Sequence, residues 1–177
     1  PAGQQVYLAA SGTLTVAAAS DMPIAQNRAM GEVGQTLATF KLTTGPQEAI
    51  NITKIIVTDT LAGTATAATG SVINLKLFKA DGTQVGTTVA SMTSSAVGQN
   101  ALATFDGLAL SLAKDKAEVL TLKGDINAYP NAVSGSTHAF KVQGNGDVTA
   151  IGATSGIGIA MTGAAISGNV QRAYRAE

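Results

Sequence analysis

Hydrophobic and polar residues alternate along many short stretches of this chain, the pattern of β-strands that bury one face. In Thr36–Thr43, for example, Ala38, Phe40 and Leu42 fall on the same face. Period two in short segments bounded by Gly, Pro, Asn and Asp predicts strands joined by turns. The predicted strands are Gln5–Ala9, Thr13–Ala19, Thr36–Thr43, Asn51–Thr60, Val72–Phe78, Gln84–Val89, Ala101–Leu112, Glu118–Ile126, His138–Val142, Asp147–Ile151 and Asn169–Tyr174.

Many short strands with turn signals at fairly regular spacing predict an all-β, immunoglobulin-like antiparallel sandwich. Such sheets bury one face and expose the other. Asp81-Gly82 is predicted as a type I′ hairpin turn, which needs φ > 0 at both central positions. The residues predicted to face inward between the two sheets are Phe40, Leu42, Ile52, Ile56, Leu75, Leu77, Leu120 and Leu122.

The stretch Pro23–Gly34 shows no clear period and is predicted as a loop. It divides the chain into two predicted parts: residues 1–34 form a strand-like N-terminal arm and loop, and residues 35–177 form the sandwich. A domain that begins at Thr36 has enough strands to close without the arm. The arm therefore either packs into a neighbouring subunit or folds back as the first strand of its own domain.

The composition of the chain argues against several classes of partner and site. The net charge is +0 and only 12% of residues are charged, which argues against nucleic acid as a partner. Cys is absent, so no disulfide or Cys-based metal site forms. No stretch reaches the ~18 consecutive apolar residues of a membrane helix, so no membrane span is predicted. Because the sequence begins at Pro1 with no initiator Met, we expect a processed product or a fragment of a longer protein.

One glycine pattern has the spacing of a nicotinamide cofactor site. Gly152-Ala-Thr-Ser-Gly156-Ile-Gly158 follows the Gly-x-x-x-Gly-x-Gly spacing of short-chain dehydrogenases. That chemistry needs a helix and a complete βαβ unit after the glycines, with an acidic residue about 20 positions on. Only Ile159 to Glu177 remain, and they are rich in Gly and β-branched residues. The segment is therefore predicted as a strand, a turn and another strand, with no cofactor.

The side chains that carry chemistry are scattered. His138 is the only histidine, and with no second His or Cys to join it we predict a strand residue beside a turn. No Asp-x-Asp-x-Asp-Gly loop of EF-hand type is present. A loop-built calcium site from Asp59, Asp106 or Asp125 is the alternative. No serine lies in a Gly-x-Ser-x-Gly elbow beside a His partner. We therefore predict that the chain is not an enzyme and has no catalytic or metal-binding residues.

Four stretches, taken together, follow a characteristic order of strands and turns. They are LATFKLTTGPQEAINITKIIVTDT, SVINLKLFKADGTQVGTT, AEVLTLKGDINAYP and DVTAIGATSG. Together, over about Leu37 to Ser155, they resemble the immunoglobulin-like domains of large bacterial and archaeal surface proteins, including S-layer-like, adhesin-like and pilus-like chains. The resemblance implies an extracellular location at the cell surface and a structural role. It carries no catalytic residues.

Both ends of the chain are strand-like and weakly charged, and an unpaired strand edge is adhesive. We therefore predict a structural subunit of an extracellular filament or surface layer, assembled by strand complementation or edge pairing between copies. The alternatives are a carbohydrate-binding or adhesive module, with cell-surface glycans as partners, and a stalk repeat of a larger surface protein. The predicted subunit-interface residues are Val6, Leu8, Leu14, Val16, Val170 and Tyr174.

Overall fold

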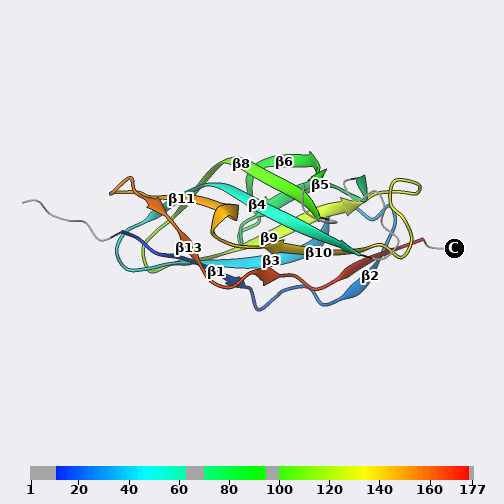
Figure 1. Cartoon of the computed structure of the whole chain (residues 1–177), viewed down its shortest axis with the longest axis horizontal. Helices are drawn as coiled ribbons and strands as arrows, with labels where there is room; N and C mark the ends of the chain where they lie inside the picture. Colours follow the sequence, from blue (N-terminus) through cyan, green and yellow to red (C-terminus); the bar gives the residue numbers. More distant parts are fainter. Residues whose placement is uncertain (1–10, 63–69, 95–99, 176–177) are drawn as a thin grey trace, which may run out of the picture.

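The computed structural model describes residues 11–62, 70–94 and 100–175, and this part of the chain is almost entirely β (Figure 1). The predicted all-β class is confirmed. A short 3₁₀ helix, η2 (Asn145–Asp147), precedes β11. The strands are β1 (Leu14–Ala18), β2 (Gln26–Ala29), β3 (Gln35–Thr44), β4 (Ile50–Ala62), β5 (Val72–Phe78), β6 (Gln84–Ser91), β7 (Thr93–Ser94), β8 (Asn100–Leu112), β9 (Ala117–Ile126), β10 (Thr137–Val142), β11 (Val148–Gly152), β12 (Gly158–Ile159), β13 (Met161–Thr162), β14 (Ile166–Ser167) and β15 (Gln171–Tyr174).

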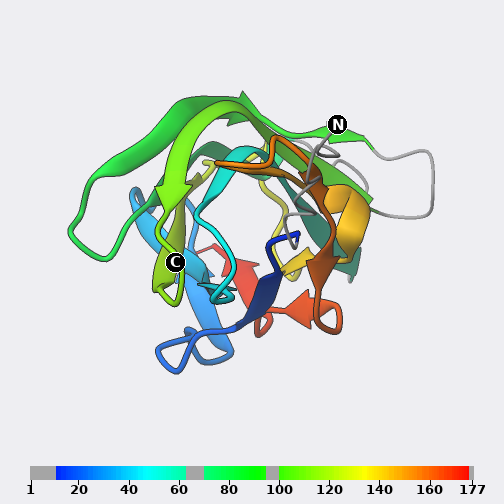
Figure 2. The same ribbon diagram turned by 90° about the vertical axis from the view of Figure 1, so that its left-hand side faces the viewer.

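The strands form two sheets that enclose one interior, as the view along the long axis shows (Figure 2). The six-stranded sheet has the order β13-β1-β3-β9-β5-β6, and the nine-stranded sheet contains the path β12-β11-β4-β10-β15-β2. Within the latter, β8 lies along one edge of β4, while β11 and β10 follow each other along its other edge. β7 pairs with β8, and β14 pairs with β10. Most pairs are antiparallel, but β1 with β13 and β2 with β15 are parallel.

The described part of the predicted N-terminal arm contributes to both sheets. β1 lies between β13 and β3, and β2 lies beside β15, so paired strands cross the boundary predicted at residue 34. The stretch Pro23–Gly34, predicted as a loop, thus contains a strand. The Arg28 side chain holds β2 in place by donating hydrogen bonds to Gln171 Oε1 (3.0 Å), Gln35 Oε1 (2.6 Å) and the Thr36 carbonyl (2.8 Å). The sequence of β2 has no alternating apolar pattern. These polar and backbone contacts, and not the burial of an apolar face, hold the strand in place.

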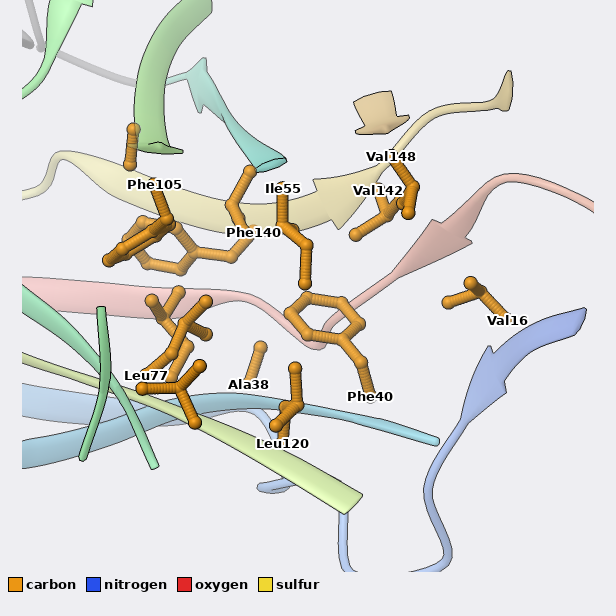
Figure 3. Close-up of a cluster of buried hydrophobic side chains, with 14 of the residues drawn as sticks. Val16, Ala38, Phe40, Ile55, Leu77, Phe105, Leu120, Phe140, Val142 and Val148 are labelled. Atoms are coloured by element: carbon orange, nitrogen blue, oxygen red, sulfur yellow. The ribbon is translucent and has the colours of Figure 1, made fainter. Parts of the chain in front are cut away.

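Aliphatic and Phe side chains from both sheets fill the interior (Figure 3). The space left between Val16, Phe40, Leu77 and their neighbours is about 10 Å³, no more than the ~10–15 Å³ of accessible volume that a single water needs. The core is therefore closely packed. Of the eight residues predicted to face inward, those that are buried are Phe40, Leu42, Ile52, Leu75, Leu77, Leu120 and Leu122.

The eighth residue predicted to face inward, Ile56, is only half-buried, and that prediction is wrong. A bulge at Thr53 is the reason. Ile52 is buried before it, whereas Ile55 and Val57 are buried after it. The pairing of β4 with both β8 and β11 shifts register at this point. One extra residue in a strand moves every later side chain to the opposite face.

The hairpin between β5 and β6 also differs from its prediction. Gly82 has a positive φ of 84°, but Asp81 does not, so the turn is not type I′. The Gly82 N–H donates to the Lys79 carbonyl (3.0 Å), and the Lys79 N–H donates to the Thr83 carbonyl (2.9 Å). This is the three-residue loop in which a type I turn is followed by a left-handed glycine. The hairpin itself was correctly predicted, and the Asp-Gly pair serves a longer loop.

Candidate functional site

Two predicted interface residues, Leu14 and Val16, belong to the core of their own domain. Their exposed fractions are 0% and 2%, and β1 is hydrogen-bonded to β3 and β13 of the same chain. The prediction that these two side chains pack into a neighbouring sheet is therefore corrected: in this structure their own chain buries them. Alternation along β1 directs both inward, and β3 supplies the partner strand. Val6 and Leu8 lie outside the described residues.

The other two predicted interface residues, Val170 and Tyr174, face solvent at the end of the chain. Their exposed fractions are 43% and 40%, whereas Gln171 and Ala173 between them are buried. This alternation puts one face of β15 in the core and the other outside. β2 covers the edge of β15, and in the described part of the chain no strand pairs with the far edge of β2. The structure thus leaves both side chains accessible, and their contact with another subunit stays a prediction.

Further apolar side chains are exposed on the segments around β15. Tyr129 is 63% exposed, and the guanidinium of Arg175 lies over its ring, 4.8 Å from the centroid. Val33 is also exposed. It lies shortly after Met30, whose N–H donates a hydrogen bond to the Tyr174 carbonyl of β15. The loop that contains Tyr129 is tied to β15 through the bond from the Gly135 N–H to the Ala173 carbonyl. We call the exposed residues Val33, Tyr129, Val170 and Tyr174 the C-terminal patch; they lie on neighbouring segments, and exposed Arg172 lies between Val170 and Tyr174 on the outer face of β15.

A second pair of exposed apolar residues, Ile151 and Ile157, lies on β11 and on the turn that follows it. We call these two the turn patch. In Figure 1, β11, β13 and the start of β1 lie toward one end of the long axis, and β2 and the end of β15 lie toward the other. The two patches therefore belong to opposite parts of an elongated molecule.

The glycine-rich segment Gly152–Gly158 is the predicted strand, turn and strand: β11 ends at Gly152 and β12 begins at Gly158. Its turn binds an anion, and the anion is the protein's own Glu48. One oxygen, Oε2, accepts from the Thr154 and Ser155 N–H groups, both at 3.0 Å. The other, Oε1, accepts from the Ser155 hydroxyl (2.7 Å) and the Gly12 N–H (3.2 Å). Converging backbone amides are the feature this turn shares with phosphate-binding loops.

Glu48 joins three segments that are distant in sequence: the start of β1, the loop before β4 and the β11–β12 turn. The hydrogen bonds from Ser155, followed by the one from the Thr154 amide, lower the pKa of the carboxyl from 4.5 to about 2. Gly152 makes this close approach possible, since a Cβ there would overlap Glu48 Oε1 and Ser155 Oγ. The sequence pattern identified a turn with accessible amides, but it contained no signal that Glu48 would occupy them.

The Glu48 carboxylate should make stability depend on acid. Because its pKa is lowered in the folded state, its contribution is complete above about pH 4.5 and is lost as the pH falls toward about 2. In Glu48→Gln the side-chain amide meets N–H donors with an NH₂ group, so we expect a lower urea midpoint near neutral pH. The gap between parent and variant should shrink at low pH. Urea unfolding over a pH series measures this, with Glu32→Gln as the control of equal charge change. A gap that stays constant down to pH 2 would contradict the assignment.

A second buried carboxylate, Asp59 of β4, pairs with His138 of β10. Asp59 Oδ2 lies 2.6 Å from His138 Nδ1, and the two side chains are 0% and 1% exposed. Burial raises the pKa of Asp59 above its ordinary 3.8, and the hydrogen bond and charge of His138 oppose that shift. His138 Nε2 has no hydrogen-bond partner among the described residues, so no hydroxyl there completes a hydrolytic triad. The pair is thus a buried polar contact between two paired strands, in which Asp59 also accepts a hydrogen bond from the Ala139 backbone N–H.

The prediction for His138 located it on a strand, as observed, but missed its burial and its partner. The signal was present, since His138 shares the inward phase of Phe140 and Val142. The other two candidates for a calcium site do not join Asp59. Asp106 is an exposed residue of β8, and Asp125 of β9 accepts hydrogen bonds from the Gly34 amide and the Asn74 side chain. In the described ranges, no three acidic, His or Cys side chains gather as a metal site would require.

The described part of the chain contains no helix with the length and hydrophobicity needed to cross a membrane. Comparison with known proteins adds no family: no family model matches the sequence, and a search of the curated proteins found no similar one.

Proposed function

We propose that the protein is a structural subunit of an extracellular filament or surface layer that self-associates through its two apolar patches. The observation that carries this proposal is the position of the exposed large apolar side chains. Ile151 and Ile157 form the turn patch, and the C-terminal patch lies toward the other end of the molecule. Exposed apolar groups that gather in patches mark interaction sites.

Two different patches at opposite ends favour a head-to-tail contact. When one end of a subunit binds the other end of the next, each new subunit presents a fresh end, and an open chain grows unless rotation closes it into a ring. A two-fold dimer would instead use the same patch on both copies. Strand edges that have no partner among the described residues strengthen the contact, because β12 and β2 end the path through the nine-stranded sheet. Edge pairing thus replaces donation of β1 as the mechanism of assembly.

Composition and resemblance support an extracellular setting for this assembly. The surface is weakly charged and rich in Thr and Ser, and the chain contains no Cys. The order of strands and turns resembles the immunoglobulin-like domains of bacterial and archaeal surface proteins. The two-sheet architecture is compatible with that relationship.

The proposal is tested by blocking one end at a time. Ile157→Asp blocks the turn patch, and Tyr174→Asp blocks the C-terminal patch. We expect the parent chain to grow in mass with concentration in light scattering and to form filaments or sheets in electron micrographs. Each variant alone should stay monomeric, because a buried carboxylate at the contact is costly. Thr87→Asp, on the exposed face of β6, is the matched control and should assemble like the parent.

Mixing the two blocked variants distinguishes the modes of contact. In a head-to-tail contact each variant retains one intact end, so the mixture should form dimers that neither variant forms alone. A two-fold contact predicts that one of the variants still dimerises by itself. A parent chain that is monomeric at every concentration would instead identify an isolated stalk repeat and overturn the proposal.

A further inference from the structure

A groove of about 550 Å³ crosses the outer face of the six-stranded sheet. Thr121 and Lys123 contribute from the outward side of β9, where they alternate with buried Leu120 and Leu122. The β5–β6 hairpin contributes Phe78 and Lys79, and the turn after β1 contributes Ser20 and Asp21. The volume is that of a small-molecule site. No residue that lines the groove belongs to either apolar patch, so the groove is separate from both.

The charged groups of the groove are available to a ligand. Lys79 and Lys123 are half-buried, and the Lys123 ammonium lies 5.3 Å from the centroid of the Phe78 ring. Within the described residues, neither lysine forms a direct ion pair with a carboxylate. Lys79 still acts on Asp81, because its charge adds to the Thr83 hydrogen bonds that lower the pKa of that carboxyl. The acidic side chains nearby in the hairpin region are engaged with backbone: Asp81 accepts from the Thr83 N–H (2.8 Å), and Glu118 accepts from the Ala80 N–H (3.2 Å).

We propose that this groove binds an acidic saccharide, a sugar that carries a ring carboxylate. The two ammonium groups donate charge-assisted hydrogen bonds to the carboxylate. Asp21 accepts hydrogen bonds from sugar hydroxyls, and the Ser20 and Thr121 hydroxyls both donate and accept. The Phe78 ring lies under the Lys123 ammonium and so positions that lysine. A chain with few aromatic residues can thus recognise a sugar mainly through charge and hydroxyl groups.

The presence of Asp21 in the groove favours a saccharide over an acidic peptide as the ligand. A run of Asp and Glu residues would place further carboxylates beside Asp21 and could offer its oxygens only backbone N–H donors. A sugar acid presents one carboxylate per ring together with several hydroxyl groups, which matches two lysines, one aspartate and two hydroxyls. This binding does not depend on self-association, because the groove and the apolar patches share no residue.

The test uses the full chain and three probes: trigalacturonate, neutral galactotriose and hexaglutamate. Isothermal titration should show saturable binding of trigalacturonate that weakens with added salt, and no comparable binding of the other two. Lys79→Gln and Lys123→Gln should each weaken the affinity about tenfold, the equivalent of ~1.4 kcal/mol. Lys141→Gln, which removes the same charge from β10 in the other sheet, should leave the affinity unchanged.

Several results would overturn the proposal. Trigalacturonate affinity that is the same in Lys79→Gln, Lys123→Gln and the parent would locate the binding elsewhere. Equal binding of galactotriose would remove the role of the carboxylate, and equal binding of hexaglutamate would show a surface that attracts any anion. No saturable binding at millimolar concentration would show that the groove is not a saccharide site.

Discussion

Replacing Asp59 with alanine is expected to lower the free energy of unfolding by about 1–3 kcal/mol. Asp59 and His138 are both buried and contact each other at 2.6 Å. Removing the carboxylate leaves the imidazole in an apolar core with no partner for Nδ1. The cost comes from that unpaired polar group, which keeps its desolvation penalty, and not from the loss of a strong attraction. Urea unfolding followed by circular dichroism measures the change.

A double variant separates these two causes. Asp59→Ala combined with His138→Leu keeps the total side-chain volume similar and leaves no buried polar group from the pair. We expect its stability to return to within about 1 kcal/mol of the parent or to exceed it, as apolar replacements of buried ion pairs often do. If the double variant is as unstable as Asp59→Ala, the pair contributes through its own attraction and the explanation fails.

Truncating Leu122 to alanine is expected to cost about 2–5 kcal/mol. Leu122 is completely buried on β9, in the sheet that faces Phe140 and Phe105 across the interior. The surrounding core contains little free space and cannot collapse fully into the cavity that the substitution leaves. Thr121→Ala, one position along the same strand and on the outer face, is the matched control and should cost less than about 1 kcal/mol. Thermal and urea unfolding give both values, and a Leu122→Ala variant that unfolds like its control would contradict the face assignment.

The bulge in β4 allows truncations of two adjacent isoleucines to be compared. Ile55 is 3% exposed and Ile56 is half-buried, although the two are adjacent and identical in type. Ile55→Ala should therefore resemble a core truncation, whereas Ile56→Ala should cost about 1 kcal/mol. The opposite order would mean that β4 continues without a bulge at Thr53.

The glycine-rich turn shows why a short motif does not specify a ligand. The turn at Gly152–Gly158 presents backbone N–H groups, as phosphate-binding loops of similar glycine spacing do. The ligand of these groups is Glu48 of the same chain, which accepts hydrogen bonds from Thr154 and Ser155. The same backbone geometry that would hold a pyrophosphate elsewhere here connects three segments of a β fold. An internal carboxylate with a pKa of about 2 stays ionised and keeps this connection closed at neutral pH.

Local pattern alone determined the class and most of the elements of this protein. Strand β5 has the bounds that alternation predicted, Val72–Phe78, and seven of the eight residues predicted to face inward are buried. The physical reason is that a strand with one buried face must alternate, and each residue carries that information without reference to its partners. The turn at Gly152–Gly158 was predictable for the same reason, because glycine preferences are local.

Tertiary structure decided everything that depends on a distant partner. The bulge at Thr53 reverses the inward phase of β4 because β8 and β11 pair with it out of register. β2 exists because pairing with β15 and the hydrogen bonds of the Arg28 side chain hold this short, mostly polar segment extended. Asp59 meets His138 across 79 positions, and Glu48 meets Ser155 across 107. Such contacts arise only when the sheets bring separate segments together, since the local sequence around one partner contains no signal for the other.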